Sequence, residues 1–215
     1  MESQEDNFSL ANYDRCLKLA NNLGFKFYTL KDWKKSEEKG SAILRHDVDT
    51  QVDTAVKMAT LENENNINAT YFIRLHSHGY NPLCLKDFDK IREIKNMGHE
   101  IGLHYESDFY HLINKPICDF LKKEINILED IFDISIESIC PHEPTRTKSF
   151  YIDSEKNLTQ AYDNMLLEKF KYISDSSCMW RDGSFYENLT KKDLKNLYVL
   201  THPYWWYNIT PIENY

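Results

Sequence analysis

Short apolar, β-branched runs alternate with longer helical patterns along most of this 215-residue chain. Strands that alternate with helices pair in parallel through right-handed crossovers, so the pattern predicts an α/β sheet or barrel. The expected strands are residues 25–30, 41–49, 67–75, 99–105, 134–141, 170–175 and 197–202. The expected helices are residues 9–22, 51–65, 87–97 and 118–132, and a long stretch that follows residue 141 and ends near 168.

No internal repeat, low-complexity tract or Gly/Pro-rich linker marks a domain boundary. The length suits one sizeable core and is short for two. We therefore predict a single domain over residues 1–215, in which residues 1–40 form an N-terminal helix and strand extension.

The charge balance narrows the range of partners. A formal net charge of −8 argues against binding to nucleic acid or to an anionic membrane surface. The N-terminal residues MESQEDNFSL contain no apolar run, and no stretch approaches the ~18 apolar residues of a membrane span. The five cysteines form an odd set without a CxxC pair, which indicates reduced thiols. We expect a cytoplasmic protein that inserts into no membrane.

Reactive side chains stand at the carboxyl end of nearly every predicted strand, where α/β barrels collect their catalytic groups. In chain order they are His46, Asp47, Asp49, Arg74, His76, His78, His104, His142, Asp175 and His202. The strand interiors are otherwise apolar. This ring of polar residues predicts a site at one mouth of the barrel.

Asp47 and Asp49 are two residues apart, so on a strand both point the same way, whereas His46 points to the other side and is expected to be structural. Two converging carboxylates suit a division of labour in which one binds a metal and the other acts as a base. The alternative is an Asp-rich turn that caps the next helix.

The histidines differ in what their positions predict. His99 and His104 face opposite sides of one strand, and we expect His104, at the carboxyl end, to enter the site. His142, in the rigid segment CPHEP, is either a ligand or an ordinary loop residue. His202 ends an apolar strand, and its imidazole suits a general acid near neutral pH.

Four ordered motifs, ILRHDVD, NATYFIR, NMGHEIGLHYE and VLTHP, resemble those of polysaccharide deacetylases, also called carbohydrate esterase family 4. They extend from about residue 41 to 202, and GHEIGLH is the most specific. The Asp-Val-Asp block resembles a divergent branch associated with bacterial surface-polysaccharide gene clusters. The resemblance implies a distorted (β/α)7 barrel and a divalent metal, commonly zinc, that polarises an acetamido carbonyl and activates water.

By the same resemblance, Asp47 corresponds to the catalytic base and Asp49 to the acidic metal ligand. His104 matches the first histidine of the metal-binding pair, and His202 matches the histidine that protonates the leaving amine. Because Val48 separates two aspartates that are usually adjacent, the roles of base and ligand are open to exchange.

Two further departures concern the ligands and the base. Asp108 stands where the family has its second metal histidine, and the usual Arg-Pro-Pro-Tyr block appears only as Cys140-Pro141-His142, without the arginine that steadies the base. We expect His142 to act as the third ligand, with Asp108 as the alternative.

The expected reaction is hydrolysis of an N-acetyl or other N-acyl group on a sugar, carried by a nucleotide-linked or lipid-linked precursor in the cytoplasm. Candidate substrate contacts are Trp180, Arg181, Trp205 and Arg74, whose guanidinium suits a carboxylate or phosphate. Packing of the C-terminus is the other interpretation of the Trp205–Trp206 pair.

Two rival functions remain. One is another metal-dependent C–N hydrolase that acts on a small amide or formyl group. The other is a lapsed enzyme that binds a glycan or a partner without turnover, which the missing histidine and arginine favour. The retention of Asp47, Asp49, His104 and His202 argues against a lapsed enzyme.

Overall fold

The computed structural model describes residues 8–114, 116–153 and 157–214. Residues 1–7, the first part of the N-terminal segment MESQEDNFSL, lie outside this set. Its strands are β1 (Lys26–Tyr28), β2 (Ser41–Val48), β3 (Thr70–Ile73), β4 (Glu100–Tyr105), β5 (Ser138–Pro141), β6 (Thr159–Gln160), β7 (Lys171–Ser174) and β8 (Asn196–Thr201).

The helices are α1 (Leu10–Asn22), α2 (Asp53–Glu64), α3 (Leu85–Asn96), α4 (Ser107–Leu112), α5 (Ile117–Phe132), α6 (Pro144–Thr147), α7 (Asn164–Lys169) and α8 (Phe185–Leu189). Three 3-10 turns complete the set: η1 (Leu30–Lys35), η2 (Pro203–Trp205) and η3 (Pro211–Asn214). Within the described residues, no helix combines the length and the apolar character that crossing a membrane requires.

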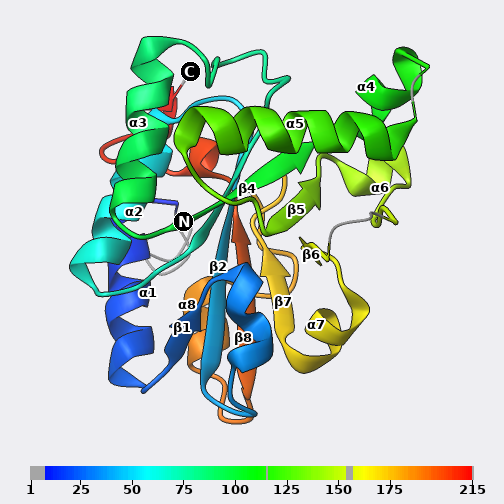
Figure 1. Cartoon of the computed structure of the whole chain (residues 1–215). Helices are drawn as coiled ribbons and strands as arrows, with labels where there is room; N and C mark the ends of the chain where they lie inside the picture. The colour runs from blue at the N-terminus through cyan, green and yellow to red at the C-terminus, as the bar shows by residue number, and fades with distance from the viewer. Residues whose placement is uncertain (1–7, 115, 154–156, 215) are drawn as a thin grey trace.

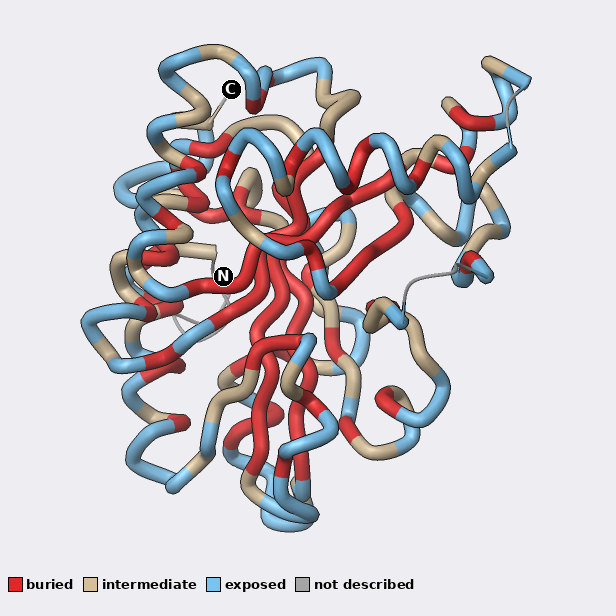
Figure 2. Tube along the Cα trace, viewed as in Figure 1, coloured by how far each residue is buried: buried red, intermediate tan, exposed pale blue. Residues whose placement is uncertain are grey.

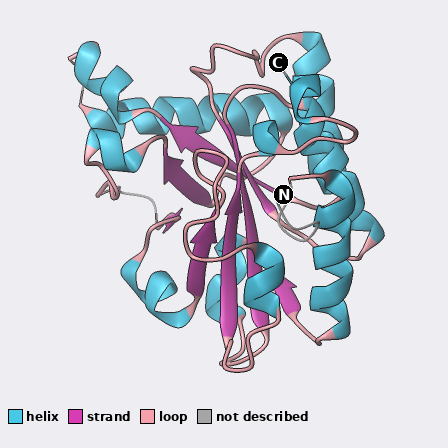
Figure 3. Ribbon diagram, turned by 180° about the vertical axis from the view of Figure 1, so that it is seen from behind, coloured by secondary structure: helices cyan, strands magenta, loops and turns pink. Residues whose placement is uncertain are grey.

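The strands form one curled parallel sheet in the order β6-β5-β4-β3-β2-β8-β7, with β1 beside β2. Helices α1, α2, α3 and α5 lie around the outside of this sheet (Figures 1 and 3). The predicted α/β fold, a distorted (β/α)7 barrel, is confirmed in this curled, half-barrel form. Because all strands run the same way, their carboxyl ends meet at one edge of the sheet.

Alternate residues of β2 belong to different cores, as the period of a strand requires. Leu44 and Val48 pack in the large core beneath the helices, whereas Ile43 packs in a smaller core on the concave side. Figure 2 shows the central strands buried throughout, while the helices bury only one face. The same alternation directs Arg45 and Asp47 into the concave side.

Two histidines face away from the concave side, as the sequence predicted. His99 accepts a hydrogen bond from the Ala69 amide on Nδ1 and donates from Nε2 to the Ala59 carbonyl, both at 3.1 Å. His46 is fully buried on the helix side of β2. Both are therefore structural.

The prediction of one long helix after residue 141 is wrong. The described residues of this stretch form α6, β6 and α7 instead. Glu143 and Lys148 adopt left-handed backbone angles, with φ of 47° and 55°, which end helical geometry on both sides of α6. Asp163 then starts a separate helix by accepting hydrogen bonds from two backbone amides of α7.

A buried polar cluster joins α1 and α2 to the back of β2. Glu62 accepts hydrogen bonds from the hydroxyls of Tyr13 and Tyr71, and its Oε1 lies 2.7 Å from His46 Nε2. His46 Nδ1 lies 2.6 Å from the Thr201 hydroxyl of β8. Burial alone would raise the pKa of Glu62, but the neighbouring histidines hold it below its ordinary value. The cluster therefore holds a carboxylate inside the protein.

We predict that Glu62→Gln lowers the free energy of unfolding at pH 7 by about 1–3 kcal/mol, since buried donors lose their charged acceptor. The loss shrinks as the pH falls below about 4.3, the ordinary value of a glutamate, because a lowered folded-state pKa stabilises only above that value. Urea unfolding at pH 7 and pH 3 measures both effects. Glu64→Gln, at the exposed end of the same helix, is the control; equal losses from both variants at pH 7 would contradict the prediction.

Candidate active site

A buried ion pair occupies the concave side of β2. Arg45 donates from Nε to Asp47 Oδ1 at 2.8 Å and from Nη2 to Asp47 Oδ2 at 2.7 Å. The guanidinium lies over the Tyr162 ring, 4.7 Å from its centroid. Burial alone would raise the pKa of Asp47, but Arg45 brings it below the ordinary value. Asp47 is therefore a fixed carboxylate at neutral pH.

Arg45 is a site residue that the sequence analysis missed. The Cys140-Pro141-His142 segment lacks an arginine, as the sequence indicated, but Arg45 of the same strand as Asp47 donates to it instead. The available signal was the spacing in ILRHDVD. An arginine two residues before an aspartate on a strand shares its face.

His104 of β4 presents one ring nitrogen to both aspartates. Its Nδ1 lies 3.0 Å from the carbonyl of Cys140, and since a carbonyl only accepts, Nδ1 carries the hydrogen. Its Nε2 lies 3.3 Å from Asp49 Oδ1 and 3.6 Å from Asp47 Oδ2. The other ring nitrogen, Nε2, thus faces both carboxylates, while a backbone carbonyl orients the ring through Nδ1, as is usual for a metal-binding histidine.

His142 approaches the same oxygen from the loop after β5. Its Nε2 lies 3.7 Å from Asp49 Oδ1, and its ring is nearly perpendicular to that of His104, at 88°. Its backbone amide donates to the Tyr105 carbonyl at 2.8 Å, which ties the loop to the end of β4. Burial and then His104 lower the pKa of His142, so the ring is neutral at pH 7.

The alternative ligand Asp108 does not join this group. It lies on α4, where its half-exposed carboxylate pairs with Arg146. The structure therefore brings His142, and not Asp108, to Asp49.

Asp49, His104 and His142 offer the donor types that a divalent metal takes. Within the described part of the chain, Asp49 Oδ1 is buried and has no hydrogen-bond partner, although two imidazole nitrogens lie within 3.7 Å. A buried acceptor left without a donor is costly, and a cation satisfies it. One carboxylate with two imidazoles is also a ligand set that zinc prefers.

A second group could also hold a metal. One ligand atom each from Asp47, His104 and Cys140 lies within 4.8 Å of the other two, and all three residues are buried. Both oxygens of Asp47, however, accept from Arg45, whose Nη2 is 2.6 Å from the Cys140 sulfur. Burial raises the pKa of the Cys140 thiol well above its ordinary value, so a metal bound there has to displace a proton from the thiol.

His202, after β8, is held by a buried carboxylate. Its Nδ1 donates to Asp175 Oδ1 at 2.6 Å, and Trp206 donates to Asp175 Oδ2 at 2.9 Å. The other ring nitrogen, Nε2, lies 4.0 Å from Asp49 Oδ2. Burial would lower the pKa of His202, but Asp175 raises it to about 9. His202 is therefore protonated at neutral pH, and Asp175, noted in the sequence only as a strand end, is its partner.

The predicted substrate contacts differ in their surroundings. Trp180 stacks on Phe8 at 6.0 Å, and Arg181 is exposed. Trp205 is partly buried, and its indole nitrogen is buried without a hydrogen-bond partner in the described residues. Arg74 is only 6% exposed and pairs with Glu106. Contact of these residues with a substrate remains a prediction.

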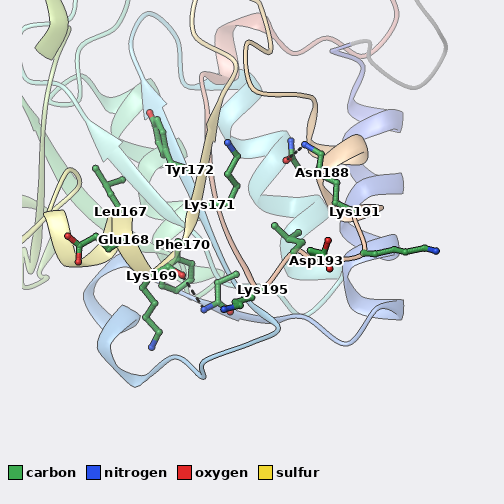
Figure 4. Close-up of a pocket in the computed structure, with 13 residues that line it drawn as sticks. Leu167, Glu168, Lys169, Phe170, Lys171, Tyr172, Asn188, Lys191, Asp193 and Lys195 are labelled. Atoms are coloured by element: carbon green, nitrogen blue, oxygen red, sulfur yellow. Dashed lines mark hydrogen bonds between the residues drawn. The ribbon is translucent and has the colours of Figure 1, made fainter.

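A groove of about 850 Å³ opens at the opposite end of the sheet, where β7 and β8 begin. Figure 4 shows two of its lysines, Lys169 and Lys171, directed away from each other, while Lys191 donates to Asn188 at 2.8 Å. The groove thus lacks converging reactive groups, and the chemistry is concentrated at the carboxyl ends of the strands.

No family model matches the chain, and no curated protein is significantly similar to it. Among solved structures, it is similar to the Streptococcus pyogenes deacetylase PplD in complex with acetate, at 16% identity over 93% of this chain and 82% of that chain, with a TM-score of 0.46. It is also similar to the chitin deacetylase from the fungal pathogen Colletotrichum lindemuthianum, at 17% identity over 77% of this chain and 74% of that chain, with a TM-score of 0.44. Identities and TM-scores this low leave the activity to be derived from the chemistry of the site.

We predict that Arg45 and Asp47 are energetically coupled. Either Arg45→Met or Asp47→Leu leaves one buried charge unpaired and lowers the free energy of unfolding by about 3–5 kcal/mol. The double variant removes both charges and recovers most of that loss. Urea unfolding of the four proteins measures the coupling.

The matched control is Arg146→Met, which breaks exposed pairs with Asp108 and Glu143 and should change the free energy of unfolding far less. Losses that simply add in the double variant would show that the two side chains do not depend on each other.

Proposed function

We propose that the chain is a metal-dependent deacetylase that hydrolyses an N-acetyl or other N-acyl group on a sugar. One observation carries this proposal. A carboxylate held ionised, Asp47, and an imidazole held protonated, His202, flank one group of metal-binding side chains. A base and an acid in these protonation states are what amide hydrolysis requires at neutral pH.

Asp49, His104 and His142 are the proposed ligands, and zinc is the proposed metal. Three protein ligands are typical of catalytic zinc, which keeps a further position open. A bound divalent metal supplies Lewis acidity that polarises a carbonyl and acidifies water. Asp47 is proposed as the base rather than a ligand because Arg45 occupies both of its oxygens.

The side chains divide the proton transfers between them. Asp47 accepts a proton from water as the water oxygen bonds to the carbonyl carbon. His202 Nε2 then donates a proton to the amide nitrogen as the C–N bond breaks, and Asp175 stabilises the imidazolium through Nδ1. The products are a free amine on the sugar and a carboxylate such as acetate.

The missing second metal histidine and the missing motif arginine favoured a lapsed enzyme, but another residue of this chain lies in the place of each. Arg45 provides the guanidinium beside Asp47, and His142 provides the second imidazole beside Asp49. This supports an active hydrolase over a protein that only binds glycans.

The substrate follows from the motifs and from the rim of the site. We propose that the reaction belongs to surface-polysaccharide biosynthesis, because of the resemblance of the Asp-Val-Asp block. Trp205 is proposed to contact the sugar, since its buried indole nitrogen has no acceptor in the described residues. Trp180 and Arg181 are proposed outer contacts.

The activity is tested by acetate release from N-acetylated nucleotide sugars and chitooligosaccharides, followed by NMR with zinc-loaded protein. We predict release by the wild type, and a kcat about 10²–10⁴-fold lower for Asp47→Asn, because general base catalysis contributes about that much. Asp47→Asn should retain its zinc. Absence of acetate release from every N-acetyl sugar by zinc-loaded wild type would overturn the proposal.

The pH dependence tests the role of His202. Its pKa is raised to about 9, so the acid form is present below that pH, and kcat/KM should fall as the pH rises through about 9. Asp175→Asn removes the carboxylate that raises the pKa and should shift this alkaline limb to lower pH. Asp182→Asn, an exposed change near the end of the same loop, is the control. An unmoved limb in Asp175→Asn would exclude His202 as the acid.

A further inference from the structure

We propose that Arg74 is a positioning residue that holds Asp49 in place for metal binding, rather than a contact for an anionic substrate. This inference rests on the proposed metal site, and it concerns three neighbouring strands. Asp49 follows β2, Arg74 follows β3 and Glu106 follows β4.

The guanidinium of Arg74 bridges the ends of these strands. Its Nε and Nη2 both donate to Glu106 Oε1, the Nε at 2.9 Å. Its Nη1 donates to the backbone carbonyl of Asp49 at 3.2 Å and lies 3.8 Å from Asp49 Oδ1. Arg74 therefore connects Asp49 to the strand that carries His104.

The loop that follows Arg74 holds the same backbone. Ser77 donates to the carbonyl of Asp49 at 2.8 Å, and Tyr80 donates to the carbonyl of Val48 at 2.9 Å. The amide of Arg74 in turn donates to the Tyr80 hydroxyl at 2.7 Å. Three side chains of one segment thus fix two successive peptide groups of the turn.

Close packing makes this contact rigid. A Cβ on Gly79 would lie 2.0 Å from the carbonyl oxygen of Thr50, so only glycine lets the loop approach the turn after Asp49 this closely. A rigid turn matters because the backbone of Asp49 sets where its carboxylate meets His104 and His142.

The surroundings of Arg74 do not suit an anionic substrate group. The side chain is 6% exposed, and its donors are directed to Glu106 and Asp49. Glu106 and Asp49 already take up the hydrogen-bond donors of the guanidinium, which leaves it little to offer a carboxylate or phosphate. An anion would have to displace Glu106 from a charge-assisted pair.

The test is the zinc affinity of the full chain, measured by competition with a chromophoric chelator, with zinc ion as the probe. Loss of a residue that orients a ligand typically weakens metal binding about 10–100-fold. We expect a loss in that range for Arg74→Met, a smaller one for Arg74→Lys, and none for Arg146→Met, which breaks an arginine–carboxylate pair that does not touch Asp49. In an Asp49→Ala background, Arg74→Met should cause no further loss.

Circular dichroism establishes that each variant is folded. If Arg74→Met does not fold, Ser77→Ala tests the inference instead. It removes a hydrogen bond to the same Asp49 carbonyl and should also weaken zinc binding. If the folded Arg74 or Ser77 variants bind zinc as tightly as the wild type, the inference about Arg74 is wrong, but the proposed deacetylase function still stands. If Arg74→Met raises KM only for anionic sugars, Arg74 contacts the substrate instead. Absence of zinc binding by the wild type would overturn the metal-dependent function, and the inference with it.

Discussion

Arg45 and Asp47 of β2 neutralise each other inside the curled sheet, through two hydrogen bonds of 2.7 and 2.8 Å. A guanidinium this deep needs a carboxylate partner, because an unpaired buried charge costs several kcal/mol. Once Asp47 is held in this way, both of its oxygens have donors, and Asp49 is left as the aspartate that faces the histidines. The pair thereby distinguishes two carboxylates that are only two residues apart: Arg45 holds Asp47, and the histidines face Asp49.

The remaining charges of the site follow the same principle. His202 is paired with Asp175, which keeps its ring protonated and oriented. His104 is oriented by a backbone carbonyl at Nδ1, so its Nε2 faces the aspartates. Asp49 Oδ1 is a buried oxygen that accepts no hydrogen bond from the described residues. This oxygen, with two imidazoles beside it, supports the proposed cation site.

Much of this arrangement could be predicted from the sequence, because it follows from strand periodicity and parallel topology. Asp47, Asp49, His104, His142 and His202 meet at one end of the sheet for that reason. Arg45 was missed because it lies within a strand that was interpreted as an apolar run. Its pairing with Asp47 also depends on which face of the sheet is concave, and the sequence does not indicate that face. The helix expected after residue 141 failed because left-handed turns at Glu143 and Lys148, both non-glycine residues, carry no clear sequence signal. The ion pair that removes Asp108 from the site joins residues 38 positions apart, which periodicity does not reveal.

Two groups of side chains compete for a metal here, and they share His104. One contains Asp49 and His142, whereas the other contains Asp47 and the thiol of Cys140. X-ray absorption spectroscopy of the zinc-loaded protein separates them directly, because a zinc–sulfur distance of about 2.3 Å differs from zinc–nitrogen or zinc–oxygen distances of about 2.0–2.2 Å. We predict a shell of only nitrogen and oxygen with two imidazoles, unchanged in Cys140→Ala. A sulfur neighbour that disappears in Cys140→Ala would make Asp47 a ligand and contradict its role as the base.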